Sequence, residues 1–189
     1  ADEHTWPAVL DGVWAAYLVY YPDVVAPEAL GRVRRLAELA VRSGVQRLVL
    51  LSGRGEDAAR AAEQAVLAAV SAGGIDATIV RSAFFAQNFS EKGFEEFIRA
   101  GVMALPAPEV GEPFVDAEDI ADVAVAALTG HGHAGEVYEV TGPRLLRFDE
   151  AVAEIASAIG EYVAYRRVGG GEFIAGLVDQ GVPEPEARV

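Results

Sequence analysis

The first 81 residues alternate short apolar runs with amphipathic segments. Apolar, β-branched and aromatic residues fill 13–20, 46–51 and 76–81, and helical periodicity marks 28–42 and 56–72 between them. Strands that are joined through helices must pair in parallel, and strands buried on both faces lose the alternation of polar and apolar residues. The pattern therefore predicts an α/β fold with a doubly wound parallel sheet, in which 13–20 is a central strand.

The chain beyond Arg81 reads as a looser mixture of elements. Residues 84–89 read as a loop, and Asp116 is suited to cap a helix because its carboxylate can accept from the first backbone N–H groups. We predict helices at 91–100, 117–128, 148–159 and 173–178, an extended segment at 102–108, and strands at 136–141 and 162–168. We expect one domain over 1–189, in which residues from about 84 to 189 contribute a small C-terminal, substrate-side lobe.

Charge and composition exclude several classes of function. The 189 residues contain 15 Lys and Arg against 29 Asp and Glu, which gives a formal net charge of −14, and they contain no cysteine. An acidic chain repels phosphate backbones and anionic lipids, so we expect no nucleic acid and no membrane partner. The absence of cysteine excludes disulfides and thiolate metal sites and fits a reducing, cytoplasmic setting. No apolar run approaches about 20 residues, and no signal peptide is visible.

The ends of the predicted strands define a candidate ligand site. The carboxyl ends of parallel strands meet at one edge of the sheet, which places Tyr21-Pro22, Ser52–Gly55 and Arg81–Phe85 along one crevice. Gly53 and Gly55 would let backbone amides approach an anionic or planar ligand, although a tight turn from strand to helix needs the same glycines. We predict that Pro22, Ser52 and Arg81 share a common rim.

Other polar and aromatic groups have simpler interpretations. His131 and His133 form an incomplete metal site without nearby carboxylates or thiolates, so a solvent-exposed loop is favoured and no metal is predicted. The acidic residues at 116, 118 and 119 are explained by their position at a helix start. Phenylalanines that recur between 84 and 97 could line a pocket for a planar substrate, but packing of a short helix explains most such rings.

The order of several motifs resembles a known family. Residues 18–22, 44–52 and 76–89, with Pro113–Ala121 and Tyr138–Pro143 later in the chain, are similar to the NmrA-like atypical short-chain dehydrogenases/reductases. The resemblance implies a Rossmann-like fold that binds NADP(H) or NAD(H). It places Asn88 at the substrate pocket and leaves Ser52 and Asn88 as catalytic candidates. The cofactor-binding residues that it implies are Tyr21, Pro22, Ser52, Gly53, Arg81, Ser82, Phe84 and Phe85.

The sequence also departs from the family pattern. Nothing before Trp14 supplies the glycine-rich turn that holds the pyrophosphate, so we expect the first two βα units of the family to be missing and the chain to be incomplete at its N-terminus. The sheet would then have an unpaired edge through which the chain could form a homodimer. Ser82 stands where the family usually has proline. A Tyr and Lys pair four residues apart is absent, and Lys92 is the only lysine.

These features lead to one functional prediction and two alternatives. The prediction is NAD(P)H-dependent reduction of a small planar or conjugated acceptor, such as a quinone or an imine, because such an acceptor needs little help from a protein acid. A non-enzymatic dinucleotide-binding regulator or sensor is the first alternative, favoured by the missing Tyr and Lys pair. The second is a truncated scaffold that no longer binds the cofactor.

Overall fold

Two compact units make up the part of the chain that the computed structural model describes, which comprises residues 2–20, 28–91, 94–107, 109–179 and 181–187. Unit 1 contains the described residues of Ala1–Ala83 and Ala117–Thr141, and unit 2 contains those of Phe84–Asp116 and Gly142–Val189. The sequence places everything after about residue 84 in one lobe. The structure instead returns 117–141 to unit 1, because the strand within this segment pairs with the main sheet.

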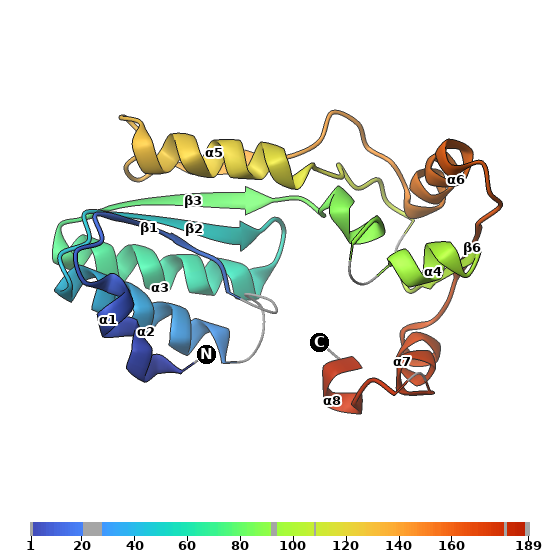
Figure 1. Cartoon of the computed structure of the whole chain (residues 1–189), viewed down its shortest axis with the longest axis horizontal. Coiled ribbons are helices and arrows are strands. Elements are labelled where there is room, and N and C mark those ends of the chain that lie inside the picture. Colours follow the sequence, from blue (N-terminus) through green and yellow to red (C-terminus); the bar gives the residue numbers. More distant parts are fainter. Residues whose placement is uncertain (1, 21–27, 92–93, 108, 180, 188–189) are drawn as a thin grey trace. The chain divides into compact units, whose positions relative to one another are not determined.

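A parallel sheet forms the centre of unit 1 (Figure 1). Among the described residues it has four strands in the order β1-β2-β3-β5, and every neighbouring pair is parallel. The strands are β1 (Ala15–Leu18), β2 (Arg47–Gly53), β3 (Asp76–Ser82) and β5 (Val137–Val140). The predicted α/β class with parallel pairing is therefore confirmed.

The position of β1 corrects one prediction. Within the described residues β1 pairs with β2 alone, so it is an edge strand and not a central one. The apolar run was read as a central strand, but apolar side chains show only that both faces of a strand are buried. Whether a strand has a neighbour on each side depends on its backbone hydrogen bonds, which the side-chain pattern does not show. Tyr17 and Val19 are 37% and 57% exposed, as is common near an open edge.

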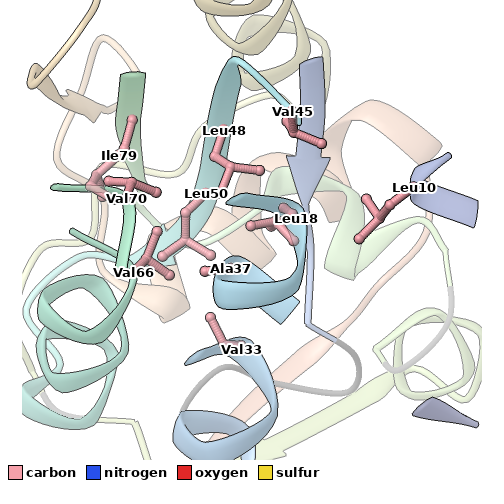
Figure 2. Close-up of a cluster of buried hydrophobic side chains, with 12 residues drawn as sticks. Leu10, Leu18, Val33, Ala37, Val45, Leu48, Leu50, Val66, Val70 and Ile79 are labelled. Atoms are coloured by element: carbon pink, nitrogen blue, oxygen red, sulfur yellow. The ribbon is translucent and has the colours of Figure 1, made fainter. Parts of the chain in front are cut away.

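Helices cover both faces of this sheet. Figure 1 shows α2 (Ala29–Arg42) and α3 (Asp57–Gly73) on one face and α5 (Ala117–Thr129) on the other. In Figure 2, Leu48 and Leu50 of β2 pack with Ile79 of β3 against apolar side chains of α2 and α3. Val49 and Val80, which alternate to the opposite face, are fully buried as well. Burial on both faces explains why these strands lack polar alternation.

Two short helices at the N-terminus were not predicted. They are η1 (Glu3–Thr5), a 3₁₀ helix, and α1 (Trp6–Leu10). Leu10 is buried in the core of unit 1, and Arg35 of α2 donates to Glu3 at 2.5 and 2.9 Å. A helix of five residues is too short to show the periodicity on which helix prediction depends.

Unit 2 combines short helices with a small parallel pair of strands. Its core is built around Met103, which is fully buried, and around a cluster of phenylalanine rings. Strands β4 (Val102–Leu105) and β6 (Ala164–Arg167) pair in parallel. The helices are η2 (Ala86–Phe89), a 3₁₀ helix in the predicted loop, α4 (Glu95–Arg99), α6 (Phe148–Ile159), α7 (Gly170–Asp179) and α8 (Glu184–Ala187).

One close backbone approach in unit 2 requires glycine. The amide of Gly142 donates to the carbonyl oxygen of Pro113 at 3.0 Å. A Cβ atom at position 142 would overlap the carbonyl oxygen of Phe114. The sequence Gly142-Pro143 therefore fits a place where two chain segments pass in direct contact.

Candidate functional site

The carboxyl ends of β2 and β3 form one rim in unit 1. Ser52 pairs with Arg81, and Gly53 pairs with Ser82, in the parallel register of the two strands. The prediction that Ser52 and Arg81 share a rim is therefore confirmed. Tyr21 and Pro22, which were predicted to join it, lie outside the described residues. Ligands in open α/β sheets bind beyond this edge, so the rim is the candidate site.

A buried carboxylate from α3 connects the two strands at this rim. The Ser52 hydroxyl donates to Oε1 of Glu63 at 2.6 Å. Arg81 donates to the same carboxylate from Nε at 2.9 Å and from Nη2 at 2.7 Å. Ser52 and Glu63 are only 2% and 3% exposed. The Ser52 proton is committed to Glu63 in this arrangement and is not offered to a substrate carbonyl.

The network continues across the rim to β5 and to the turn after β2. Glu139 of β5 lies 3.5 Å from Nη1 of Arg81 and 3.4 Å from Nε of Arg54. The amide of Arg54 also donates to the carbonyl oxygen of Ser82 at 3.0 Å. Two arginines are thus balanced by Glu63 and Glu139, and these four side chains carry no net charge.

The electrostatics of this network keep Glu63 ionised. Burial by itself raises the pKa of the Glu63 carboxyl, but the hydrogen bonds from Arg81 and Ser52 outweigh burial and hold that pKa below its ordinary value. The hydrogen bond to Glu63 is the largest cause of a raised pKa for the Arg81 guanidinium, and Glu139 adds to it. Both partners therefore stay charged around neutral pH.

The turn between β2 and α3 does not fit a pyrophosphate. Gly55 has a φ of +83°, and a Cβ atom at Gly53 would overlap the side chain of Glu56. The positive end of the α3 dipole would favour an anion, but Glu56 and Asp57 already place two carboxylates there. Gly53 and Gly55 are explained by the turn, and phosphate groups of a dinucleotide would be repelled from it.

Ser82 takes part in the rim through its backbone and its hydroxyl. It is 8% exposed, and its Oγ lies 3.4 Å from the carbonyl oxygen of Ser52, to which it donates. Proline has no side-chain donor, so this contact between neighbouring strands depends on the serine.

Three further predicted site residues belong to unit 2. The ring of Phe84 stacks on Phe94 with centroids 5.9 Å apart, and its amide donates to Glu112 at 3.1 Å. Phe85 forms a bridge with Val115, and the amide of Asn88 in η2 donates to the carbonyl oxygen of Phe85 at 3.2 Å. The structure thus brings together one group at the rim of unit 1 and another in unit 2, and their common pocket stays a prediction.

The phenylalanine rings of unit 2 pack chiefly against one another. Phe84 contacts four other rings edge-on, tilted or stacked, with centroid distances between 5.3 and 6.3 Å. Such distances are typical of aromatic pairs in protein cores. These distances support packing, and not a pocket for a planar substrate, as the main role of the cluster. Its members are Phe84, Phe89, Phe94, Phe97, Phe114 and Phe148.

The histidine pair shows no metal-binding arrangement. Nδ1 of His133 lies 2.8 Å from the hydroxyl oxygen of Tyr138, and the backbone oxygen of His133 accepts from Thr78 at 2.7 Å. Within the part of the chain that the structure describes, no three His, Cys, Asp or Glu side chains are grouped so that they could hold a metal ion. These contacts tie the loop to β3 and β5.

Unit 2 also contains a charge-balanced pocket of about 340 Å³. Arg147 pairs with Asp149 at 3.0 Å, and Arg167 pairs with Glu109 at 2.8 Å. Two cations and two anions give the pocket no preference for an anionic or a cationic ligand, and we assign it none. It is lined by Ala107, Glu109, Arg147, Phe148, Asp149, Tyr165 and Arg167.

Glu63 is the site residue that the sequence did not reveal. It lies in an alanine-rich helix, where a single carboxylate usually belongs to the solvent-exposed face. One signal was present: Glu63 directly follows Ala62 and lies three residues before Val66, so it shares the face of α3 that carries these two apolar residues, which are both fully buried. Among the helices of the described residues, none is long and apolar enough to span a membrane.

Comparison with known proteins places this architecture in a defined class. No model of a protein family matches the chain. Over 99% of its length the chain superposes on Citrobacter triphenylmethane reductase complexed with NADP(H), with a TM-score of 0.80 at 20% identity, covering 67% of that protein. An Escherichia coli NADPH-dependent quinone oxidoreductase complexed with NADPH gives a TM-score of 0.80 at 21% identity, with 99% and 66% coverage. The fold is that of the NAD(P)-binding Rossmann-like reductases.

Sequence relatives narrow the assignment. Agroclavine dehydrogenase of Claviceps fusiformis is 31% identical, over all of this chain and 68% of its own length. The chain belongs to the family of agroclavine dehydrogenase. NAD(P)H azoreductase of Xenophilus azovorans is 30% identical, over 97% of this chain and 64% of the relative. Prestalk A differentiation protein A of Dictyostelium discoideum is 28% identical, over 99% of this chain and 61% of the relative. The chain therefore spans between about three fifths and two thirds of the lengths of these relatives.

Proposed function

We propose that this chain serves the NAD(P)H-dependent reduction of a small planar or conjugated acceptor, such as a quinone or an imine. The observation that carries the proposal is the match to agroclavine dehydrogenase over the entire chain, which includes both strands of the rim. The names of other relatives and neighbours refer to azo, quinone and triphenylmethane acceptors, all of which are conjugated. Assignment to the NmrA-like branch belongs to the same proposal.

The chemistry of the rim suits one end of the proposed cofactor. A bound NADPH or NADH would supply a hydride, and the acceptor takes up this hydride and one proton. The reduced nicotinamide ring is uncharged, which fits a rim whose four charged side chains are balanced. The acidic start of α3 disfavours the phosphates, so the groups that hold them must lie outside this turn.

The proton that the acceptor takes up is assigned to water. Ser52 donates its proton to Glu63, and the sequence has no Tyr and Lys pair. An acceptor that spreads the transferred charge over a conjugated system needs the least acid assistance, which is why this class is preferred. Asn88 remains the candidate for a substrate contact in unit 2.

The proposal includes a homodimer and a cytoplasmic location. The outer side of β1 lacks a strand partner among the described residues, and pairing of two such edges would give a homodimer. Light scattering after size-exclusion chromatography measures the mass of the particle directly. A cytoplasmic location is proposed from the cysteine-free composition alone.

A regulator that binds the dinucleotide without turnover is the second candidate. It is favoured by the missing proton-donor pair and by the relationship to a protein named for prestalk differentiation. Titration of the chain with NADPH and NADH, followed by steady-state NADPH oxidation with a panel of quinones and imines, separates the candidates. Binding with turnover supports the reductase, and binding without turnover supports the regulator. Absence of binding refutes both and leaves the scaffold.

A further inference from the structure

We propose that Glu63 is a positioning residue for the ligand rim, whose buried carboxylate holds the ends of β2 and β3 in one arrangement. The inference rests on the proposed function, because it assigns a role at the same rim. It concerns a residue that touches neither cofactor nor acceptor in the proposal and that acts through Ser52 and Arg81.

The hydrogen bonding of Glu63 is complete and directed at the rim. Its Oε1 accepts from Ser52 and from Nε of Arg81, and its Oε2 accepts from Nη2 of Arg81. A fork-shaped, two-point pairing of a guanidinium with a carboxylate fixes orientation as well as distance. Since Ser52 and Arg81 are register partners, a single side chain fixes two strands at the same level.

Burial separates this ion pair from the others. Among the described residues Glu63 is the only acidic residue that is buried, at 3% exposure. An exposed pair such as Arg34 and Glu38, with side chains 60% and 43% exposed, is screened by water and contributes little. A buried carboxylate that loses its partners is left without solvation, so Glu63 must keep Ser52 and Arg81 in place.

The position of the network connects it with the ligand edge. Ser52 and Arg81 are followed directly by Gly53 and Ser82, the last residues of the two strands. The next amide, that of Arg54, donates to the carbonyl oxygen of Ser82. A displacement of Ser52 or Arg81 therefore moves the backbone that a ligand at this edge would meet. Errors of about 1 Å in such a backbone are sufficient to impair binding and catalysis.

The arrangement also decides which groups the rim withholds from a ligand. The Ser52 proton is directed to Glu63, and the Arg81 guanidinium is held between Glu63 and Glu139. The rim thus offers neither an acid nor an unpaired cation, which matches an uncharged ring. Neutralising Glu63 would release both groups at once.

The test compares Glu63→Gln with the matched variant Glu38→Gln. Both replace a carboxylate by an amide of the same shape, one in the buried network and one in an exposed pair on α2. Amide chemical shifts of Gly53, Arg54 and Ser82 are measured without ligand, and NADPH dissociation constants are measured by titration. We expect Glu63→Gln to shift all three amides and to weaken NADPH binding about 10-fold or more, with no effect of Glu38→Gln on either.

Equal NADPH dissociation constants for the unaltered chain and Glu63→Gln would make Glu63 a purely structural residue and overturn the positioning role. Failure of the unaltered chain to bind NADPH would refute the proposed function itself, and the role of Glu63 with it. If Glu63→Gln does not fold, the double variant E63Q/R81Q removes both charges and leaves none unpaired. Unchanged affinity in that variant would also overturn the proposal.

Discussion

Arg47, the first residue of β2, donates a hydrogen bond at 2.5 Å to the backbone oxygen of Gly130, which is 83 positions further along the chain. The same nitrogen lies 3.1 Å from the backbone oxygens of Ala127 and Leu128. The last carbonyl groups of a helix have no partners within the helix, and a cation there also complements the helix dipole. Arg47 therefore fastens the end of α5 to the sheet.

Replacement of Arg47 by methionine should destabilise unit 1. The change keeps an apolar stem but leaves buried carbonyl groups without a donor, and it removes the contact of the guanidinium with the Trp14 ring at 5.1 Å. We expect a loss of about 2 to 4 kcal/mol in the free energy of unfolding, measured with urea. Arg34→Met on the exposed face of α2 is the control, with a change of about 0.5 kcal/mol or less. Equal effects of the two variants would contradict the capping role.

Gly142→Ala should destabilise unit 2. A methyl group at this position overlaps the carbonyl oxygen of Phe114, and backbone cannot yield as a side chain can. We expect a cost of about 2 to 3 kcal/mol in urea unfolding. The matched change is Gly171→Ala in α7, where an added Cβ meets no atom within 4 Å. That variant should be unchanged or more stable by up to about 1 kcal/mol, because alanine favours helices.

The aromatic cluster should contribute strongly to the stability of unit 2. Phe89 is 8% exposed and contacts the rings of Phe84, Phe94, Phe114 and Phe148. Its replacement by alanine leaves a cavity, and we expect a loss of about 3 to 5 kcal/mol together with weaker near-ultraviolet circular dichroism.

The control for the aromatic prediction is Tyr162→Ala in the same unit. Tyr162 is 85% exposed, so its removal should change stability by about 0.5 kcal/mol or less. A Phe89→Ala variant as stable as the control would show that the rings enclose space for a ligand and do not form the core.

The stability that Glu63 contributes should depend on pH. The folded-state pKa of Glu63 is lowered, so its contribution to stability is fully present above the unfolded-state pKa of about 4.3 and is lost as pH falls through the folded-state pKa. Glu63→Gln should be less stable than the unaltered chain by about 3 kcal/mol at pH 7. Urea unfolding between pH 7 and pH 3 should show this difference shrinking below about pH 4.3. A difference that stays constant or grows on acidification would contradict the assignment.

Patterns along the sequence predicted the parts of the fold that depend on neighbouring residues. The helix observed at Ala29–Arg42 was predicted at 28–42, and β2 and β3 were placed within two residues of their observed ends. The common rim of Ser52 and Arg81 followed, because parallel strands of similar length end at one edge, whereas their exact register came from the structure.

Features that depend on contacts between residues far apart in the sequence could not be predicted from such patterns. Glu63 meets Ser52 only after α3 has packed on the sheet, and its place on the apolar face of this helix was the one local signal of its burial. The edge position of β1 was missed because side-chain burial does not report backbone pairing. Residues Ala117–Thr141 belong to the first unit because β5 pairs with β3. The two strands are far apart in the sequence, so local patterns do not predict this pairing.

The chain crosses between its two units three times, after Ala83, after Asp116 and after Thr141. Neither unit is consequently one continuous stretch of polypeptide. A protease that cut at any one of these junctions would release neither unit whole, since two covalent connections would remain. Gene fragments that stop at Ala83 would encode the first unit without α5 and β5, and would leave one face of β2 and β3 without its helix.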